Sequence, residues 1–310
     1  MRASSPPKRP YGRQLLSLTV CAMALPICFP MPAAGQVILR WGLQAREPVR
    51  YALTQREELT ITSGGKTLGS KNEQRVELAV TLRDKDAEGN LQLNVLVERV
   101  QINAGEYKLD SKAEPNPDDE NAVETARLLK AVMAAPMRVE LSRLGEVGAV
   151  KPPPGLAEVL GEQEESVLSV MFSPAGMRRL LAELGVGLPA DPVQDGDRWS
   201  RKLTYPVPGL GNQTLDFVYA YRGPVSEPGQ QLEQIEGQVK VSVEPAEGSK
   251  VKLEIKSQQG QVRLLFDNQS GRLHRSRLEQ QAEMRITVGD DANIDQSLKA
   301  VTLVELLEGK

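Results

Sequence analysis

The stretch VELAVTLRDKDAEGNLQLNVLV, residues 76–97, decides how the first part of this sequence folds. Apolar residues occupy every second position on both sides of a polar loop: Val76, Leu78, Val80 and Leu82 before it, and Leu91, Leu93, Val95 and Val97 after it. Such a period of two is typical of a strand with one buried face. The loop Asp84–Asn90 contains a glycine and predicts a turn. We therefore expect an antiparallel hairpin with one apolar and one mostly polar face.

The same alternation extends over two parts of the chain. Before the hairpin, a strand is expected from Val49 through Ile61, with a turn at Gly64–Lys66. A second β region is expected after Asp197. Its strands are separated by clusters of Gly, Pro, Asn or Ser, and we expect them at 215–221, 232–243, 251–255, 262–266, 273–288 and 301–307.

Helices are expected between these two β regions. The acidic triplet Asp118–Glu120 suits the positive end of a helix dipole, and Pro136 ends the helix that follows it. Ser173 and Pro174 form the N-cap and first position of another helix, which carries apolar residues at helical spacing. The segment Lys151–Gly155 contains three prolines and is expected to be a stiff spacer.

These patterns predict an α+β fold that is mainly β, with two antiparallel, curved sheet regions flanking a central helical segment. We expect an N-terminal sheet region with one helix at residues 36–150, a helical connector at 151–192 and a C-terminal antiparallel sheet region at 193–310.

Residues 1–35 are expected to be a signal peptide. Four basic residues and no acidic one lie in the first thirteen positions, and the apolar stretch Gln14–Pro30 leads into Ala33, Ala34 and Gly35. The stretch is short and interrupted by proline, which disfavours the alternative of an uncleaved membrane anchor. A lipoprotein cleaved at Cys21 or Cys28 is disfavoured further, because large residues precede both cysteines. We therefore expect an exported protein, periplasmic or extracellular, that does not span the membrane after cleavage.

The composition of the chain excludes several kinds of chemistry. Removal of the four basic residues of the leader changes the formal charge from -3 to -7, and both cysteines leave with it. The mature chain then has no thiol nucleophile and no disulfide. It contains no polybasic run, so no nucleic-acid partner is expected. We also expect no cofactor.

A hydrophobic ligand site is predicted around the central helices. Helices laid on a curved sheet can leave an apolar cavity that suits an acyl chain, and methionine fills adaptable pockets. The candidate ligand-binding residues are Met133, Met171, Phe172, Met177 and Leu181. The alternative is that these side chains are ordinary core.

The chain has a single histidine, which excludes a metal site with several histidines. It lies in a basic run, where Arg272, His274, Arg275 and Arg277 form a candidate anion-binding patch. Strict alternation would place Arg272, His274 and Ser276 on one side of a strand and the other two arginines on the opposite side. The alternative is a solvated outer strand.

Several short motifs occur in a familiar order. They include Leu39–Trp41, Val49–Tyr51, Met137–Val139 with Gly145–Val147, Val193–Trp199 with Pro206–Gly211, Tyr219–Arg222 and Gly271–Met284. In this order the chain resembles an uncharacterised family of secreted bacterial proteins, a domain-of-unknown-function family. The resemblance implies export and a non-catalytic architecture, with no known site residues. More distantly, the architecture looks like that of periplasmic lipoprotein carriers.

The sequence therefore predicts an exported, non-catalytic protein that binds a lipid or other hydrophobic ligand, or an envelope protein. One alternative is a structural or interaction module of the cell envelope without a small ligand. The other is a hydrolase that uses carboxylates, or a serine with His274.

Overall fold

The computed structural model describes residues 35–43, 47–161, 167–184, 187–207, 211–246, 248–249, 251–289 and 292–307. The expected signal peptide lies outside the described residues, except for Gly35.

All twelve strands in the described ranges belong to one antiparallel sheet. The strands are β1 (Val49–Ser63), β2 (Lys66–Lys85), β3 (Leu91–Ala104), β4 (Tyr107–Asp110), β5 (Met137–Leu141), β6 (Val147–Lys151), β7 (Arg198–Val207), β8 (Gly211–Glu227), β9 (Gln230–Glu244), β10 (Val251–Asp267), β11 (Arg272–Val288) and β12 (Ala292–Leu307). Their order across the sheet is β6-β5-β3-β2-β1-β12-β11-β10-β9-β8-β7, and β4 pairs with β3 away from this path.

The fold is mainly β and antiparallel, as predicted, but the expectation of two sheet regions flanking a helical segment is wrong. β1 pairs with β12 from Arg50↔Leu307 to Ser63↔Ile294, and this pairing joins the two regions into one open sheet. The two outermost strands, β6 and β7, are consecutive strands in the chain. The helical connector between them therefore crosses from one edge of the sheet to the other. How the chain divides into domains stays a prediction.

The hairpin that opened the sequence analysis is confirmed. β2 and β3 pair in the antiparallel direction, and the chain turns between Lys85 and Leu91. The expected turn at Gly64–Lys66 is also present, because β1 ends at Ser63 and β2 begins at Lys66. Gly64 and Gly65 both adopt positive φ there, a conformation that a residue without a Cβ adopts at little cost.

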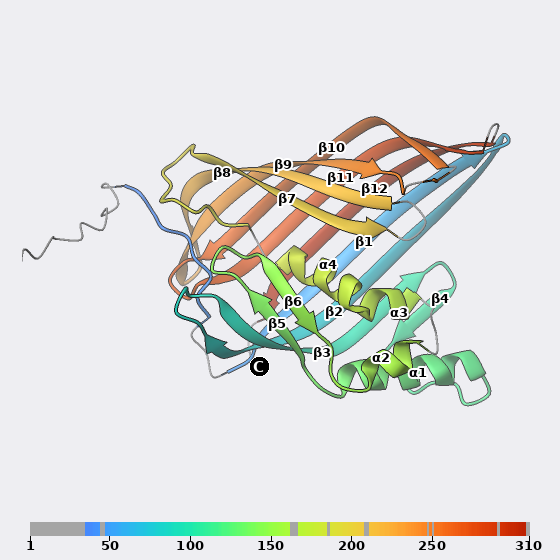
Figure 1. Ribbon diagram of the computed structural model, residues 1–310, viewed down its shortest axis with the longest axis horizontal. Coiled ribbons are helices and arrows are strands. Elements are labelled where there is room, and N and C mark those ends of the chain that lie inside the picture. Colours follow the sequence, from blue (N-terminus) through green and yellow to red (C-terminus); the bar gives the residue numbers. More distant parts are fainter. Residues whose placement is uncertain are drawn as a thin grey trace, which may run out of the picture.

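The helices are α1 (Glu120–Met133), α2 (Leu156–Gly161), α3 (Val167–Phe172) and α4 (Pro174–Leu184). The predicted N-cap at Ser173 is present, since its hydroxyl accepts from the Gly176 amide at 3.0 Å. Within the acidic triplet, the Asp119 carboxylate caps α1 by accepting from the Ala122 amide at 3.1 Å. The sheet curls around α4, which lies against its inner face (Figure 1). No helix in the described ranges is long and apolar enough to cross a bilayer.

The segment before β1 packs across one end of the sheet. The Trp41 amide donates to the Arg143 carbonyl at 2.9 Å, the Gly42 amide donates to the Gly271 carbonyl at 2.9 Å, and Val37 bridges Val193. The Trp41 ring meets Phe266 edge to face at 5.5 Å between ring centres. These contacts tie together turns that are far apart in the chain.

Candidate functional site

The helices cover only one half of the inner face of the sheet. Under α4 the inward residues are fully buried, as Leu53, Leu78 and Val304 show. Further along the same strands the inward positions are first polar, as at Gln55 and Glu57, and half-buried aliphatic residues then return with polar ones such as Ser70 and Gln296 among them. This second half, which we call the open inner face, comprises Leu59, Ile61, Leu253, Ile255, Ala282, Met284, Leu298 and Ala300.

The register of the strands brings these aliphatic residues side by side. Leu59 pairs with Leu298, which pairs in turn with Ala282. Ile255 lies opposite Met284. Their neighbours on the outer face, such as Glu58, Thr60, Glu283 and Lys299, are polar and exposed. The alternation typical of a half-buried sheet therefore continues past the described helices.

A polar belt separates the two halves of the inner face. The Gln74 side-chain amide donates to the Gln55 side chain, and Gln55 donates to the Thr302 hydroxyl at 3.5 Å. The Thr302 residue is only 7% exposed. Buried amides and hydroxyls need such partners, because an unpaired polar group inside a protein is costly.

A groove of about 390 Å³ opens beside this belt. Its apolar lining comes from Ile102 and Ala104 of β3, Tyr107 of β4 and Leu168 of α3. Thr125 of α1 and polar residues of β1 and β2 complete it, and these include two acidic residues, Glu57 and Glu73. This volume lies within the usual range of roughly 300–1,000 Å³ for small-molecule sites.

Two much smaller spaces lie beside α4, of about 40 Å³ and 30 Å³. Each has room for about one water molecule. An acyl chain could enter there only if α4 moved away from the sheet.

A charged group lies at the inner side of α4, beside the first of these spaces. The residue Glu183 is half-buried as a whole, but its carboxyl group is enclosed, and this burial raises its pKa to about 7. The charge of Arg179 opposes that increase, and the charge of Glu57 adds to it. The Arg179 guanidinium lies over the Tyr205 ring, 5.1 Å from its centre. Burial also raises the pKa of Tyr205, to about 12.

The buried side of β7 contributes a second cation. Arg201 donates to the Gly145 carbonyl at 3.0 Å, and burial lowers the pKa of its guanidinium. The side chain passes over Gly187, where an added Cβ would come within 2.2 Å of the Arg201 Cδ. The Trp199 indole N–H donates to the carbonyl of that glycine at 2.7 Å. These contacts hold the segment after α4 against β7.

The five predicted ligand-binding residues lie in or against the core. Phe172, Met177 and Leu181 are 1%, 0% and 4% exposed, and Met133 and Met171 are partly buried against them. Among the five, Leu181 lines the space of about 30 Å³. A ligand role for these residues stays a prediction.

The structure does not gather the four residues of the predicted anion patch into one group, although His274 and Arg275 share Glu227. Arg272 faces Asp267, with 3.8 Å between Nε and Oδ2, and Arg275 faces Glu227 at 3.7 Å. His274 lies between Gln230, at 3.1 Å from its Nδ1, and Glu227, at 3.4 Å from its Nε2.

Strict alternation fails at this point because of a β-bulge. Leu273 pairs with Phe266, but Arg275 pairs with Leu265, so His274 is the extra residue of β11. Ser276 then points inward and is 6% exposed. The expectation that Arg272, His274 and Ser276 share one side is therefore wrong.

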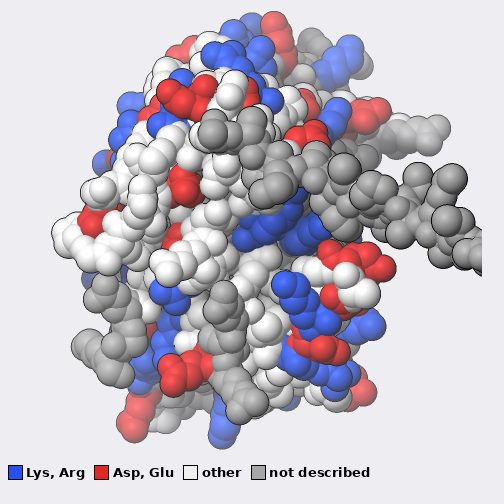
Figure 2. Space-filling model, turned by 90° about the vertical axis from the view of Figure 1, so that its left-hand side faces the viewer, with Lys and Arg blue, Asp and Glu red and all other residues white. Residues whose placement is uncertain are grey.

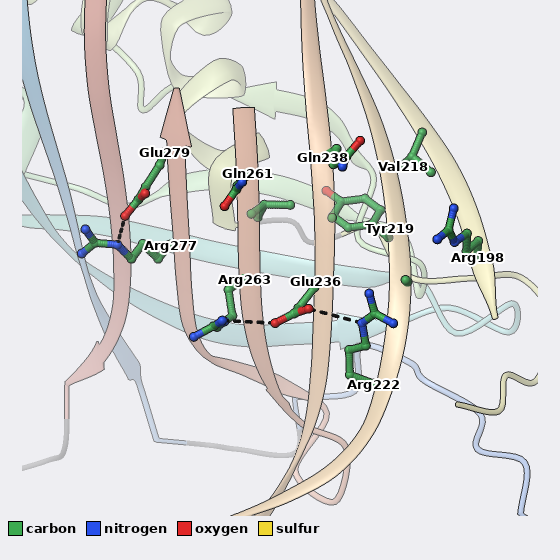
Figure 3. Close-up of a pocket in the computed structure, with 13 residues that line it drawn as sticks. Arg198, Val218, Tyr219, Arg222, Glu236, Gln238, Gln261, Arg263, Arg277 and Glu279 are labelled. Carbon is green, nitrogen blue, oxygen red and sulfur yellow. Dashed lines mark hydrogen bonds and ion pairs between the residues drawn. The ribbon is translucent and has the colours of Figure 1, made fainter. Parts of the chain in front are cut away.

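Arg277 instead joins other arginines on the outer face of the sheet. A groove of about 470 Å³ there is lined by Arg198 of β7, Arg222 of β8, Arg263 of β10 and Arg277 of β11. Glu236 lies between two of them, 3.2 Å from Arg222 and 3.2 Å from Arg263 (Figure 3). Elsewhere the surface is mixed: the end of the molecule at the left of Figure 1 shows basic and acidic side chains interspersed (Figure 2).

Sequence reasoning missed Arg198, Arg222 and Arg263 as site residues. Each is an ordinary outward position of its own strand, and only the pairing of four strands brings them together. Glu183 was also missed. A single acidic residue among the apolar positions of the α4 sequence carries no signal of its own.

The described ranges contain no group of three or more His, Cys, Asp or Glu residues that could hold a metal ion.

Comparisons with known proteins give no family for this chain. No family model matches it, and no curated protein does. The resemblance to an uncharacterised secreted family and the likeness to lipoprotein carriers therefore stay predictions.

Solved structures give only weak similarity. DynF from the dynemicin biosynthesis pathway of Micromonospora chersina has a TM-score of 0.22 at 9% identity, covering 96% of this chain and 94% of that one. OccAB4 of Acinetobacter baumannii has a TM-score of 0.18 at 6% identity, covering 85% of this chain and 99% of that one. OccK11 (OpdR) of Pseudomonas aeruginosa has a TM-score of 0.18 at 7% identity, covering 87% and 99%. Similarity at this level supports no argument about fold or function.

Proposed function

We propose that this chain is an exported, non-catalytic protein that binds an acyl chain, or a similarly elongated apolar molecule, on the open inner face of its sheet. The observation that carries the proposal is the continued alternation of the strands. Leu59 and Leu298 point to the same side as the buried core, yet the described helices stop short of them. Apolar surface gathered in this way favours a partner that removes it from water.

The shape of the site favours a small elongated ligand. The groove of about 390 Å³ runs beside the polar belt of Gln55 and Gln74, and its apolar wall includes Ile102 and Leu168. A polar group of the ligand at this belt would find amide donors and acceptors, while its chain would lie along the aliphatic rows.

Burial of a chain on this face supplies the affinity. Each methylene removed from water contributes about 0.8 kcal/mol. Each further methylene that lies on the rows of Leu59 and Ile61 would therefore add to the affinity, which has to exceed the entropy cost of association.

The first test is native mass spectrometry of residues 36–310, purified from an exported preparation without detergent, with an organic extract analysed alongside. We expect a stoichiometric mass of lipid size that is recovered in the extract. A clean mass of the protein alone would count against the proposal.

A second test uses a fluorescent fatty acid and a pair of variants. Leu59→Glu places a charge on the open inner face, and we expect it to abolish binding. Thr60→Glu is the matched control, because it is the next residue of β1 but points to the outer face and is exposed. Equal binding by both variants would overturn the proposal.

A second candidate function is an envelope interaction module. It is supported by the strand β7, Arg198–Val207, which lies at an edge of the sheet and contains the half-buried Trp199. An edge strand can pair with an extended segment of a partner. This reading predicts that Ser200→Pro, which removes a backbone donor, abolishes capture of a protein partner and leaves fatty-acid binding unchanged.

A further inference from the structure

The outer face of the sheet carries a row of charges that the apolar ligand site does not use. Five residues occupy directly paired positions on five successive strands: Arg198 of β7, Ala220 of β8, Glu236 of β9, Arg263 of β10 and Arg277 of β11. Neighbouring strands lie about 4.8 Å apart, so the charged groups stand close together.

The central feature of this row is a pair of like charges. Arg263 and Arg277 are direct partners in the register of β10 and β11, and both point outward. Like charges directly opposite each other destabilise a sheet. Arg277 has Glu279 at 2.5 Å in its own strand, and Arg263 shares Glu236 with Arg222.

The charges of the groove do not cancel. Four guanidinium groups line it, from Arg198, Arg222, Arg263 and Arg277, and two carboxylates, from Glu236 and Glu279. The groove therefore carries a formal charge of +2 on a chain whose formal charge is -3. Such a local excess of positive charge attracts an anion.

The floor of the groove offers neutral hydrogen-bonding groups and space. The adjacent cross-strand row places Val218, Gln238 and Gln261 side by side on β8, β9 and β10. Ala220 is the smallest side chain of its row and leaves the surface hollow beside Arg198. Figure 3 shows Gln238 and Gln261 on the same face as the arginine and glutamate side chains of the groove.

We propose that this groove binds a phosphate-type oxyanion, with Arg263 and Arg277 as its two principal contacts. A guanidinium presents two parallel N–H donors, which match two oxygens of one phosphate. An anion between the two arginines removes their mutual repulsion. The glutamine amides supply further donors to a ligand that extends along the floor.

The test is calorimetric titration of the protein with inorganic phosphate at low ionic strength. We expect saturable binding that weakens as salt is added, because screening acts on exposed charges. Replacing either arginine, as Arg263→Gln or Arg277→Gln, should weaken binding by about tenfold, since each removes a charged hydrogen-bonding contact. Arg56→Gln is the matched control, because Arg56 is also an exposed arginine of the outer face, paired with Glu73 at 3.1 Å.

Thermal unfolding provides a second readout that does not need a measured heat. Without phosphate, Arg277→Gln should unfold at a higher temperature than the unchanged protein, because the like-charge pair is gone. At a fixed phosphate concentration, phosphate should raise the unfolding temperature of the unchanged protein and of Arg56→Gln more than that of Arg277→Gln.

A sedimentation experiment with vesicles of phosphatidic acid in phosphatidylcholine distinguishes a lipid headgroup from a soluble phosphate as the ligand. Sedimentation with these vesicles that is lost in Arg263→Gln assigns the site to a lipid headgroup. Phosphate binding without sedimentation assigns it to a free or soluble phosphate. The proposal is overturned if phosphate gives no saturable heat, or if Arg263→Gln and Arg56→Gln bind it equally.

Discussion

The hydroxyl of Tyr51 donates a hydrogen bond to the backbone carbonyl of Leu273 at 3.1 Å and so connects β1 with β11, although β12 lies between these strands. The ring is 2% exposed. Burial raises the pKa of this phenol far above its ordinary value, so it remains a neutral donor at any physiological pH.

We expect Tyr51→Phe to lower the free energy of unfolding by about 1–2 kcal/mol, because the buried Leu273 carbonyl loses a partner while the ring stays in place. Urea unfolding measures this. Tyr107→Phe is the control, since Tyr107 is 51% exposed and should tolerate the change. Equal stability of both variants would mean that the bond contributes nothing.

Glu183 is expected to make stability depend on pH. Its folded pKa of about 7 lies above its ordinary value of 4.5, so the folded state holds the proton more tightly than the unfolded state. This contribution is fully present below pH 4.5 and is lost as the pH rises through 7. The total loss is about 3 kcal/mol, from the linkage between a pKa shift and stability.

The variant Glu183→Gln keeps the shape and removes the titration. We expect its free energy of unfolding to be flatter between pH 5 and pH 8 than that of the unchanged protein, and higher at pH 8. The titratable and charged groups around this carboxyl are Arg179, Glu57, Tyr205, Arg201 and Tyr219. A Glu183→Gln profile parallel to that of the unchanged protein would show that the carboxyl titrates normally.

Two glycines that meet across a hydrogen bond should respond differently to alanine. Gly271 has φ of +63°, and an added Cβ would lie 2.5 Å from the Gly42 backbone nitrogen. Gly271→Ala should therefore destabilise by about 1–3 kcal/mol, from the strained backbone and the clash. Gly42→Ala meets nothing within 4 Å and should be tolerated. Thermal unfolding of the two variants checks this difference.

Met177 tests whether the predicted ligand residues act as core. The side chain is 0% exposed, so Met177→Ala should cost about 2–5 kcal/mol by leaving a cavity. Val170→Ala on the neighbouring helix is the control, because Val170 is 48% exposed. A Met177→Ala protein of unchanged stability would indicate that the methionine lines space rather than filling it.

The hairpin and the helix cap were predictable because the sequence patterns that specify them lie within a few neighbouring residues. The alternation before and after Asp84–Asn90 needs only neighbouring residues, and so does the cap at Ser173. The bulge at His274 was not predictable, because it arises from the pairing of Leu273 and Arg275 with β10. One displaced residue moved Ser276 to the inner face.

The union of the two sheet regions was also beyond sequence reasoning. It depends on the register of Arg50 with Leu307, and the two segments show no pattern that selects each other over other strands. The candidate sites share this difficulty. The open inner face and the arginine-lined groove consist of ordinary alternating residues. Only the pairing of the strands shows which of these residues lie together.

The pairing of the first long strand with the last determines when the sheet can be completed. During synthesis, β1 and β2 are made first and can pair with each other. The other edge of β1 has no native partner until β12 has been synthesised. An unpaired edge of a long strand is a template for association with other chains. Until its final strand is made, the nascent protein therefore exposes an edge at which it can associate with other chains.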